Sequence, residues 1–110
     1  MDDELKIYSV EFAETAIRQI AAIREYIAVE ADGNIANRFA SSVISHGEGL
    51  NLFPHRGSDR SDIRPGLRTI SYKKRTVLAF DVDDTESIVT IYGVFYGGQD
   101  INAWFDANPV

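Results

Sequence analysis

Seven basic side chains lie between residues 56 and 75, and they are the densest group in this sequence that could bind an anion. This basic segment holds only two acidic residues, whereas residues 1–55 and residues 76–110 are both net acidic. Clustered cations create a local positive field, and an arginine can hold a carboxylate or a phosphate through two parallel hydrogen bonds. We expect most of the seven side chains to lie in solvated turns. The seven are Arg56, Arg60, Arg64, Arg68, Lys73, Lys74 and Arg75.

Arg68 is the member of the basic segment that we expect to be functional. It follows the turn Pro65-Gly66 and alternates with Leu67 and Thr69. Such alternation is typical of a strand, which fixes the direction in which each side chain points. The sequence therefore predicts an anion-binding arginine on a strand, although an arginine in this position can also belong to an ordinary solvated face.

The other residue types that could perform chemistry do not form a catalytic or metal-binding pattern. Two histidines, His46 and His55, stand without an HExxH motif, and the absence of cysteine excludes thiolate sites. Ser41-Ser42 falls inside a predicted helix, whereas a nucleophilic serine needs a sharp turn. Gly97-Gly98 lacks the spacing and the lysine of a phosphate-binding loop. We therefore predict no catalytic residue, no metal and no cofactor.

The composition is that of an ordinary globular chain. With 110 residues, of which 45% are hydrophobic and 25% charged, we predict one domain over residues 1–110. A net charge of −6 argues against a general or sequence-specific nucleic-acid binder. No apolar run approaches the roughly 20 residues of a membrane helix, and the acidic start Met1-Asp2-Asp3-Glu4 differs from a basic secretory leader. We expect a soluble cytoplasmic protein without a membrane partner.

Two amphipathic helices are predicted in the first half of the chain. Apolar residues recur at three- and four-residue steps over residues 12–27 and again over residues 35–50. The turn Asp32-Gly33-Asn34 separates the two stripes, and Asn34 is expected to cap the second helix. Pro54 ends that helix. Helices joined by so short a turn pack as an antiparallel hairpin.

Strands are predicted on both sides of this helical hairpin. A first strand covers residues 6–10, and period-two patterns predict three more over residues 67–72, 76–82 and 87–96. The short turns between the last three favour an antiparallel meander. Residues 55–65 form a polar loop, and residues 100–108 form a short terminal helix. The predicted fold class is α+β: an N-terminal strand, an antiparallel helical hairpin, then a three-stranded antiparallel sheet.

Four motifs, taken together and in this order, resemble the RelE/ParE superfamily of bacterial toxins. The resemblance runs from Lys6 to Asp100 and implies the toxin of a type II toxin–antitoxin pair, held inactive by an antitoxin whose C-terminal part wraps around it. The motifs are Tyr26-Ile27 in the first helix, Leu50-Asn51-Leu52-Phe53-Pro54-His55-Arg56-Gly57 after the second, Pro65-Gly66-Leu67-Arg68 before the sheet, and the closing Tyr96-Gly97-Gly98-Gln99-Asp100.

The superfamily has two branches, and the resemblance implies different activities for them. The RelE branch cuts messenger RNA in the ribosomal A site, which requires cations beside the phosphate and a group that transfers protons. The ParE branch inhibits DNA gyrase and has no catalysis of its own. Arg68 matches the strand arginine of the nucleases, but residues 76–82 carry no basic side chain, and Tyr96 and Gly98 stand where ParE relatives often have histidine and arginine. We therefore expect a ParE-type toxin with a ParD-like antitoxin.

Two alternatives stay open. The first is a ribosome-dependent endoribonuclease, in which Arg68 binds the scissile phosphate while Tyr72 or Tyr96 assists. The second is a toxin fold that has lost its toxicity and serves only as an antitoxin-binding module, an idea motivated by Gly98 in place of the usual basic residue.

Contact residues are assigned from exposure and chemistry. The antitoxin is expected to lay a helix along the helical hairpin and to send its tail over the sheet near Arg68. A tryptophan–phenylalanine pair suits an interface anchor, although the same pair could equally cap the core. For the antitoxin we assign Arg64, Arg68, Tyr72 and Arg75. For the gyrase target we assign Tyr96, Gln99, Asp100, Trp104 and Phe105.

Overall fold

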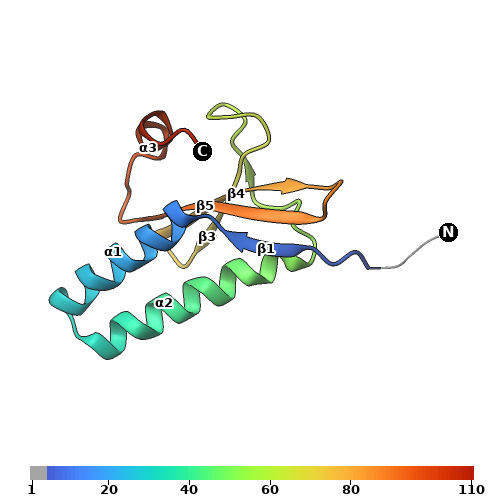
Figure 1. Cartoon of the computed structure of the whole chain (residues 1–110). Coiled ribbons are helices and arrows are strands. Elements are labelled where there is room, and N and C mark those ends of the chain that lie inside the picture. Colours follow the sequence, from blue (N-terminus) through green and yellow to red (C-terminus); the bar gives the residue numbers. More distant parts are fainter. Residues whose placement is uncertain (1–4) are drawn as a thin grey trace.

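The chain folds into two helices on one face of a sheet and a short third helix on the other face (Figure 1). The computed structural model describes residues 5–110, so the acidic start Met1-Asp2-Asp3-Glu4 lies outside the described residues. Within the described part, no helix combines the length and the apolar character that crossing a bilayer requires. The elements are β1 (Ser9–Phe12), α1 (Glu14–Glu30), α2 (Gly33–Glu48), the 3-10 helix η1 (Gly49–Asn51), β2 (Ser58–Asp59), β3 (Arg68–Tyr72), β4 (Thr76–Asp83), β5 (Ile88–Tyr96) and α3 (Ile101–Ala107).

The sheet has five strands in the order β1-β5-β4-β3-β2, and this corrects the predicted three-stranded sheet. The predicted meander β3-β4-β5 is confirmed, because both of its pairings are antiparallel. The N-terminal strand β1 joins the sheet beside β5 in parallel, so the sheet is mixed. A parallel pairing needs a long crossover, which the helical hairpin is part of. The two-residue strand β2 lies in the segment predicted as a loop and pairs with Arg68 and Thr69.

The helices form where the apolar stripes predicted them, with differences at both ends of α2. The helix ends at Glu48, before the predicted end at Pro54, and the 3-10 helix η1 follows it. The buried residues of α1 recur at the expected three- and four-residue steps. The N-cap of α2 is Asp32, whose carboxylate accepts a hydrogen bond of 2.8 Å from the backbone N–H of Ile35. Asn34, the predicted cap, instead lies inside the first turn of the helix. Asp32 has the extended backbone that a capping residue needs.

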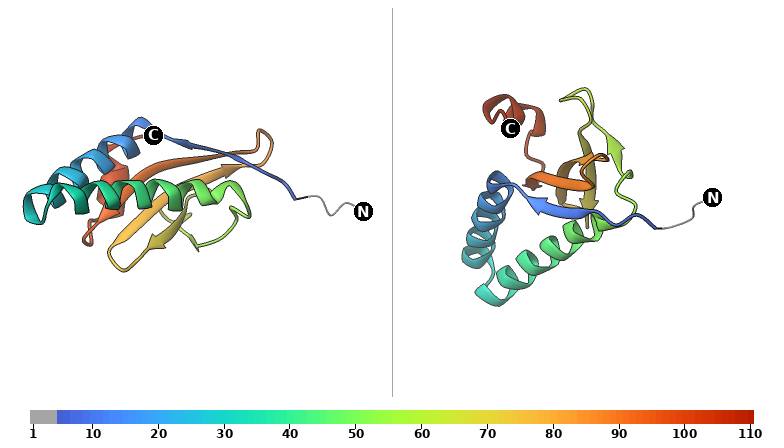
Figure 2. Two further views of the ribbon diagram at one scale, coloured as in Figure 1. Left: turned by 90° about the horizontal axis from the view of Figure 1, so that it is seen from below. Right: turned by 45° about the vertical axis from the view of Figure 1, so that its right-hand side comes forward.

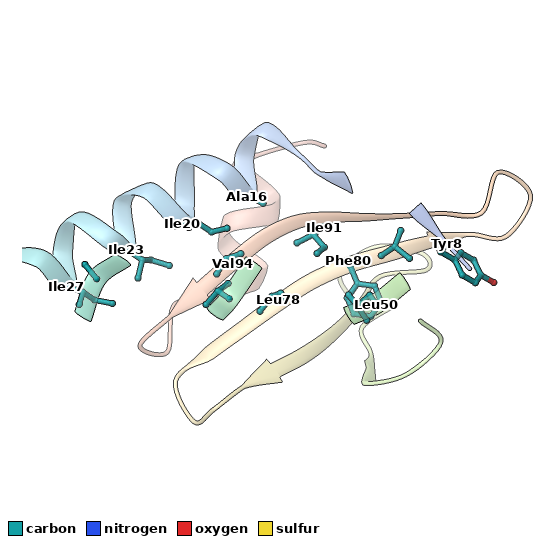
Figure 3. Close-up of a cluster of buried hydrophobic side chains, with 13 residues drawn as sticks. Tyr8, Ala16, Ile20, Ile23, Ile27, Leu50, Leu78, Phe80, Ile91 and Val94 are labelled. Carbon is teal, nitrogen blue, oxygen red and sulfur yellow. The ribbon is translucent and has the colours of Figure 1, made fainter. Parts of the chain in front are cut away.

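The main core lies between the helical hairpin and the sheet (Figure 3). Gly47 allows the close approach of α2, because a Cβ atom at this position would lie 2.8 Å from Ile91 Cδ1 and from Phe12 Cζ. The fully buried valine, leucine, isoleucine and phenylalanine side chains each contribute roughly 1.5–3 kcal/mol by leaving water. The buried members are Tyr8, Ala16, Ile20, Ile23, Ile27, Ala36, Val43, Leu50, Leu78, Phe80, Val89, Ile91 and Val94.

The short helix α3 lies on the opposite face of the sheet from the hairpin (Figures 1 and 2), and a second, smaller cluster of buried side chains includes its Phe105. It consists of Leu67, Ala79, Phe95 and Phe105, with Trp104 packed against it. The alternation of side chains along β4 and β5 places Ala79 and Phe95 on this face, away from the hairpin. The short terminal helix therefore covers apolar sheet surface that the hairpin does not reach.

Candidate functional site

A groove opens where α2 faces the β3–β4 turn and the end of β5. Its cavity volume is 660 Å³, and its lining combines apolar side chains with four cations and no acidic residue. We call it the Tyr96 groove. Its lining residues are Ile35, Arg38, Phe39, Ser42, Tyr72, Lys73, Lys74, Arg75, Thr76 and Tyr96.

A second pocket adjoins the groove on the α1 side, and Arg75 and Tyr96 line both. We call this 360 Å³ cavity the Gln99 pocket. The guanidinium carbon of Arg75 lies 5.4 Å from the ring centroid of Tyr96, so a cation–π pair forms the wall between the two cavities. The lining residues of the pocket are Gln19, Ala22, Ile23, Tyr26, Arg75, Tyr96, Gly97 and Gln99.

Tyr96 is held from several sides, which gives the site a defined shape. Its ring packs edge-on against Phe39 at 5.6 Å and lies 6.3 Å from the ring of Tyr26. Its backbone N–H donates to Gln99 Oε1 at 3.0 Å, which also fixes that side chain. The last residues of β5 and the loop after it therefore present Tyr96 and Gln99 in a preorganised arrangement.

The β3–β4 turn projects three successive cations at the mouth of the groove. Tyr72 and Thr76 are paired across the turn, which leaves Lys73, Lys74 and Arg75 as its loop. Lys73 adopts a φ of 55°, a left-handed conformation that glycine and asparagine favour. The Lys73 Nζ atom lies 5.6 Å from the ring centroid of Tyr72, so the lysine covers one aromatic wall of the groove.

Of the four residues assigned to the antitoxin, the structure brings two into the groove, Tyr72 and Arg75. Arg68 instead donates from Nε to the backbone carbonyl of Arg56 at 2.9 Å and does not line the groove. Arg64 lies further away, where it donates to the carbonyl of Val110, and its guanidinium carbon is 4.8 Å from the ring centroid of Tyr92. The four assigned residues therefore do not form one surface.

The residues assigned to the target divide in a similar way. Tyr96 and Gln99 line the Gln99 pocket, whereas Asp100 caps α3 by accepting a 3.0 Å hydrogen bond from Ala103 N–H. Phe105 is only 9% exposed, so of the two roles left open for the tryptophan–phenylalanine pair the structure favours the core cap over the interface anchor. Its ring packs 4.9 Å from that of Trp104, which is half-buried. The pair caps the second cluster because the sheet face there is apolar.

Sequence reasoning missed Arg38 and Phe39, which α2 contributes to the groove. Phe39 fits the apolar stripe of the helix, so the pattern assigned it to the core. Arg38 is the only lysine or arginine in α2, and a lone cation on a helix gives no signal of its own. Both residues belong to the site because the β3–β4 turn lies opposite them across the groove. A local sequence pattern does not indicate which distant segments face each other.

A separate polar cluster ties three distant segments together. Asp84 Oδ1 accepts from Tyr8 Oη at 2.5 Å and from His55 Nε2 at 2.9 Å. The hydrogen bond from Tyr8, and then that from His55, lowers the pKa of Asp84, and the same Asp84 bond raises the pKa of Tyr8. Across residues 5–110, histidine, aspartate and glutamate side chains form no group of three suited to a metal ion.

Comparison with known proteins decides the family. A sequence model described as the ParE toxin of the type II toxin–antitoxin system parDE matches residues 10–101. This chain belongs to the ParE toxin family of type II toxin–antitoxin systems. Toxin ParE3 of Caulobacter vibrioides is 62% identical over 29 residues, and this match spans 26% of the present chain and 29% of the length of ParE3. The resemblance inferred from the four motifs is confirmed.

Two solved structures share the fold of this ParE-family chain. The chromosomal ParDE toxin–antitoxin system from P. aeruginosa matches with a TM-score of 0.72 and 17% identity, over 84% of this chain and 99% of that chain. The toxin–antitoxin complex RelBE2 from Mycobacterium tuberculosis matches with a TM-score of 0.63 and 22% identity, over 89% of this chain and 100% of that chain. At identities this low, the likeness establishes the α+β fold of the superfamily.

Proposed function

We propose that this ParE-family chain inhibits DNA gyrase and is held inactive by a ParD-like antitoxin. The family match over residues 10–101 is the observation that carries the proposal. In this reading the toxin is a binding protein that traps an enzyme and performs no chemistry itself. Tyr96 and Gln99 are its first candidates for target contact, because they line an open pocket at the end of β5.

The chemistry around Arg68 supports binding over RNA cleavage. A nuclease must stabilise the charge that develops on the phosphate with cations aimed at it. Arg68 uses its Nε to bind the carbonyl of Arg56, and β4 contributes no lysine or arginine beside it. The loop that follows Tyr96 is Gly97-Gly98, so the end of β5 supplies no cation either.

Induction of this chain without its antitoxin tests the proposal. We expect DNA synthesis to fail before protein synthesis in pulse-labelled cells, with double-strand breaks, because trapped gyrase blocks replication. Purified chain should then inhibit supercoiling by gyrase in a dose-dependent way. Translation that fails first, with cut messages, would contradict the proposal. Unaffected growth would support the non-toxic antitoxin-binding module.

One observation favours the ribonuclease as a second candidate. The ring of His46 lies 5.1 Å from that of Tyr72, and His46 shares a 360 Å³ pocket with Arg56. The pocket lies next to β3. Because His46 and Arg56 both line it, a group that can transfer protons and a cation are close together. If cells show cut messages, replacing Arg56, Arg68 or His46 by alanine should abolish the cleavage. Cleavage that survives these replacements would exclude this candidate.

Neutralisation by an antitoxin is supported by the family and by the two structural neighbours, which are toxin–antitoxin systems. We expect the chain to co-purify with the product of a neighbouring small gene and to lose its effect on growth when both are expressed. If the chain inhibits growth but binds no such product, the proposed toxicity stands and the proposed neutralisation by an antitoxin is contradicted.

A further inference from the structure

Two glutamine side chains of the Gln99 pocket are held by their oxygen atoms. Gln19 Oε1 accepts a hydrogen bond of 3.0 Å from the backbone N–H of Val94, and Gln99 Oε1 accepts one of 3.0 Å from that of Tyr96. A backbone N–H can donate only to the oxygen of a carboxamide, so these two bonds fix which end of each amide group is the oxygen. The NH2 groups of both glutamines are therefore left to donate elsewhere, and both side chains line the pocket.

Arg75 supplies the charge of the pocket. Its guanidinium carbon lies 5.4 Å from the ring centroid of Tyr96, and its Nη2 atom would lie 3.4 Å from a Cβ atom at Gly97, so the group is held between an aromatic ring and bare backbone. Within residues 5–110, the ion pairs do not include Arg75 and no acidic residue lines the pocket. The pocket therefore combines one full positive charge with two neutral NH2 donors.

This set of donors suits a carboxylate. An arginine holds a carboxylate through two parallel hydrogen bonds, and the remaining lone pairs of the same two oxygens can accept from the glutamine NH2 groups. One cation matches the single negative charge of a carboxylate, whereas a phosphate monoester carries roughly −1.5 to −2 at neutral pH. The tilted rings of Tyr26 and Tyr96, 6.3 Å apart, and the aliphatic Ile23 form further walls, so the carboxylate should be attached to an apolar group.

We infer that the Gln99 pocket binds a carboxylate joined to an apolar group, with Arg75 as the charged partner and the NH2 groups of Gln19 and Gln99 as neutral donors. At 360 Å³ the cavity has room for one such group, since pockets for small ligands begin at roughly 300 Å³. Gln19 and Gln99 line this pocket and not the Tyr96 groove. The carboxylate comes either from an acidic side chain of the target or from a free small acid. The first source rests on the proposed function and deepens it, because Tyr96 and Gln99 are the residues proposed for target contact.

The first experiment titrates the isotope-labelled full chain with benzoate, a carboxylate on a flat apolar ring, at constant ionic strength. The chain has two glutamines, Gln19 and Gln99, so their side-chain NH2 signals in a nitrogen–proton NMR spectrum report on the pocket directly. We expect both signals to shift in a saturable way with benzoate, and benzamide, which keeps the shape and lacks the charge, to bind at least about tenfold more weakly. No saturable shift of either signal with benzoate, equal binding of benzoate and benzamide, or tighter binding of inorganic phosphate would overturn the inference.

Gln99→Glu distinguishes a donor to the ligand from a residue that only supports the fold. Glutamate keeps the oxygen that accepts from Tyr96 N–H and replaces the NH2 group by a second, negatively charged oxygen. The melting temperature should therefore stay close to that of the original chain, while benzoate binds at least about tenfold more weakly, because a donor becomes a group of the same charge. Unchanged affinity would assign Gln99 to the fold and overturn its role as a donor. Gln19→Glu makes the same exchange beside Val94 and decides the question if Gln99→Glu does not fold.

Two matched controls test whether a loss of binding belongs to the pocket. Asn34→Asp makes the same exchange of an amide for a carboxylate at an exposed position of α2, where Asn34 lines neither cavity. Arg75→Glu should also weaken benzoate binding by about tenfold or more, and its control is Arg18→Glu on α1, where Arg18 is 70% exposed and pairs with Glu14. Both controls should stay within about twofold of the original affinity. Equal losses in pocket and control variants would mean that benzoate responds to the net charge of the chain, which would contradict the inferred site.

Gyrase supercoiling, measured on the same variants, identifies the source of the carboxylate. If the source is the target, Gln99→Glu and Arg75→Glu should lose inhibition together with benzoate binding, and benzoate should compete with gyrase. Inhibition that both variants keep while they lose benzoate binding would identify a free acid as the natural ligand. Benzoate binding without any gyrase inhibition by the original chain would leave the carboxylate site standing and remove the proposed target, and inhibition without benzoate binding would do the opposite.

Discussion

At the scale of single residues, Asp84 is the acceptor that joins the N-terminal segment, the loop after η1 and the β4–β5 turn. Besides the bonds from Tyr8 and His55, Lys6 Nζ donates to the backbone carbonyl of Asp84 at 2.8 Å. These groups surround an exposed carboxylate, so their joint effect depends on the ionisation of Asp84 and Tyr8 and is sensitive to pH.

The pKa shifts set the direction of that dependence. The pKa of Asp84 is lowered from 3.8, so its contribution to stability is present above 3.8 and is lost as pH falls through the folded-state pKa. The pKa of Tyr8 is raised from 10.0, so its contribution is present below 10.0 and is lost as pH rises through the folded-state pKa. Both contributions are therefore complete only between these limits.

Asp84→Asn tests this directly. The gap in melting temperature between the original chain and the variant should be largest between about pH 4 and pH 10 and should shrink on either side. Asp106→Asn, in the exposed last part of α3, serves as the control and should show no such window. A gap that stays constant across the whole range would mean that the hydrogen bonds of Asp84 do not depend on its charge.

At the scale of elements, α3 is a cover for the sheet. Phe105 is buried against Phe95 and Leu67, so Phe105→Ala should lower the free energy of unfolding by about 3 kcal/mol. Asp106→Ala, an exposed neighbour in the same helix, should change it by less than about 0.5 kcal/mol. Urea unfolding measures both. If Phe105→Ala leaves stability unchanged but abolishes gyrase inhibition, the helix contacts the target after all.

Local sequence patterns predicted most helices and strands, but they did not predict the pairing of β1 with β5 or of β2 with β3. The meander and the helical hairpin follow from periods of two and 3.6 residues, which burial on one face imposes. The parallel pairing of β1 with β5 joins residues nearly 80 positions apart, such as Val10 and Val89, and no local period contains it. The strand β2 has two residues, too few to show a period at all.

The sequence predicted several residues of the candidate site, but it did not predict that they lie close together in space. Tyr72 and Arg75 were assigned to the antitoxin, and Tyr96 and Gln99 to the target, each from its own stretch of sequence. The structure places all four around two adjoining cavities that share the wall formed by Arg75 and Tyr96. This proximity arises from the pairing of β4 with β5, which sets Thr76 opposite Tyr96.

At the scale of the whole molecule, charge is separated along the sheet. The β3–β4 turn, with its cations, and the β4–β5 turn, with Asp83 and Asp84, lie at opposite ends of β4 (Figure 2). A polar hollow at the second end includes Glu11, Asp81, Asp83 and Asp84 and no cation. An acidic partner is therefore repelled from one end of the protein and drawn to the Tyr96 groove at the other.

This arrangement leads to a prediction about how inhibition is controlled. If the antitoxin occupies the Tyr96 groove and gyrase contacts Tyr96 and Gln99, the two partners cannot bind together, because Arg75 and Tyr96 border both cavities. A glutamate-rich amphipathic peptide should then relieve gyrase inhibition competitively, so that more chain restores the inhibition, while a matched peptide with lysine in place of each glutamate has no effect. Lys74→Glu, at a residue that lines the Tyr96 groove but not the Gln99 pocket, should make inhibition resistant to the peptide, whereas Arg18→Glu should not. Co-elution of chain, peptide and gyrase as one complex would show instead that the partners use separate surfaces and that neutralisation requires a change in the conformation of the toxin.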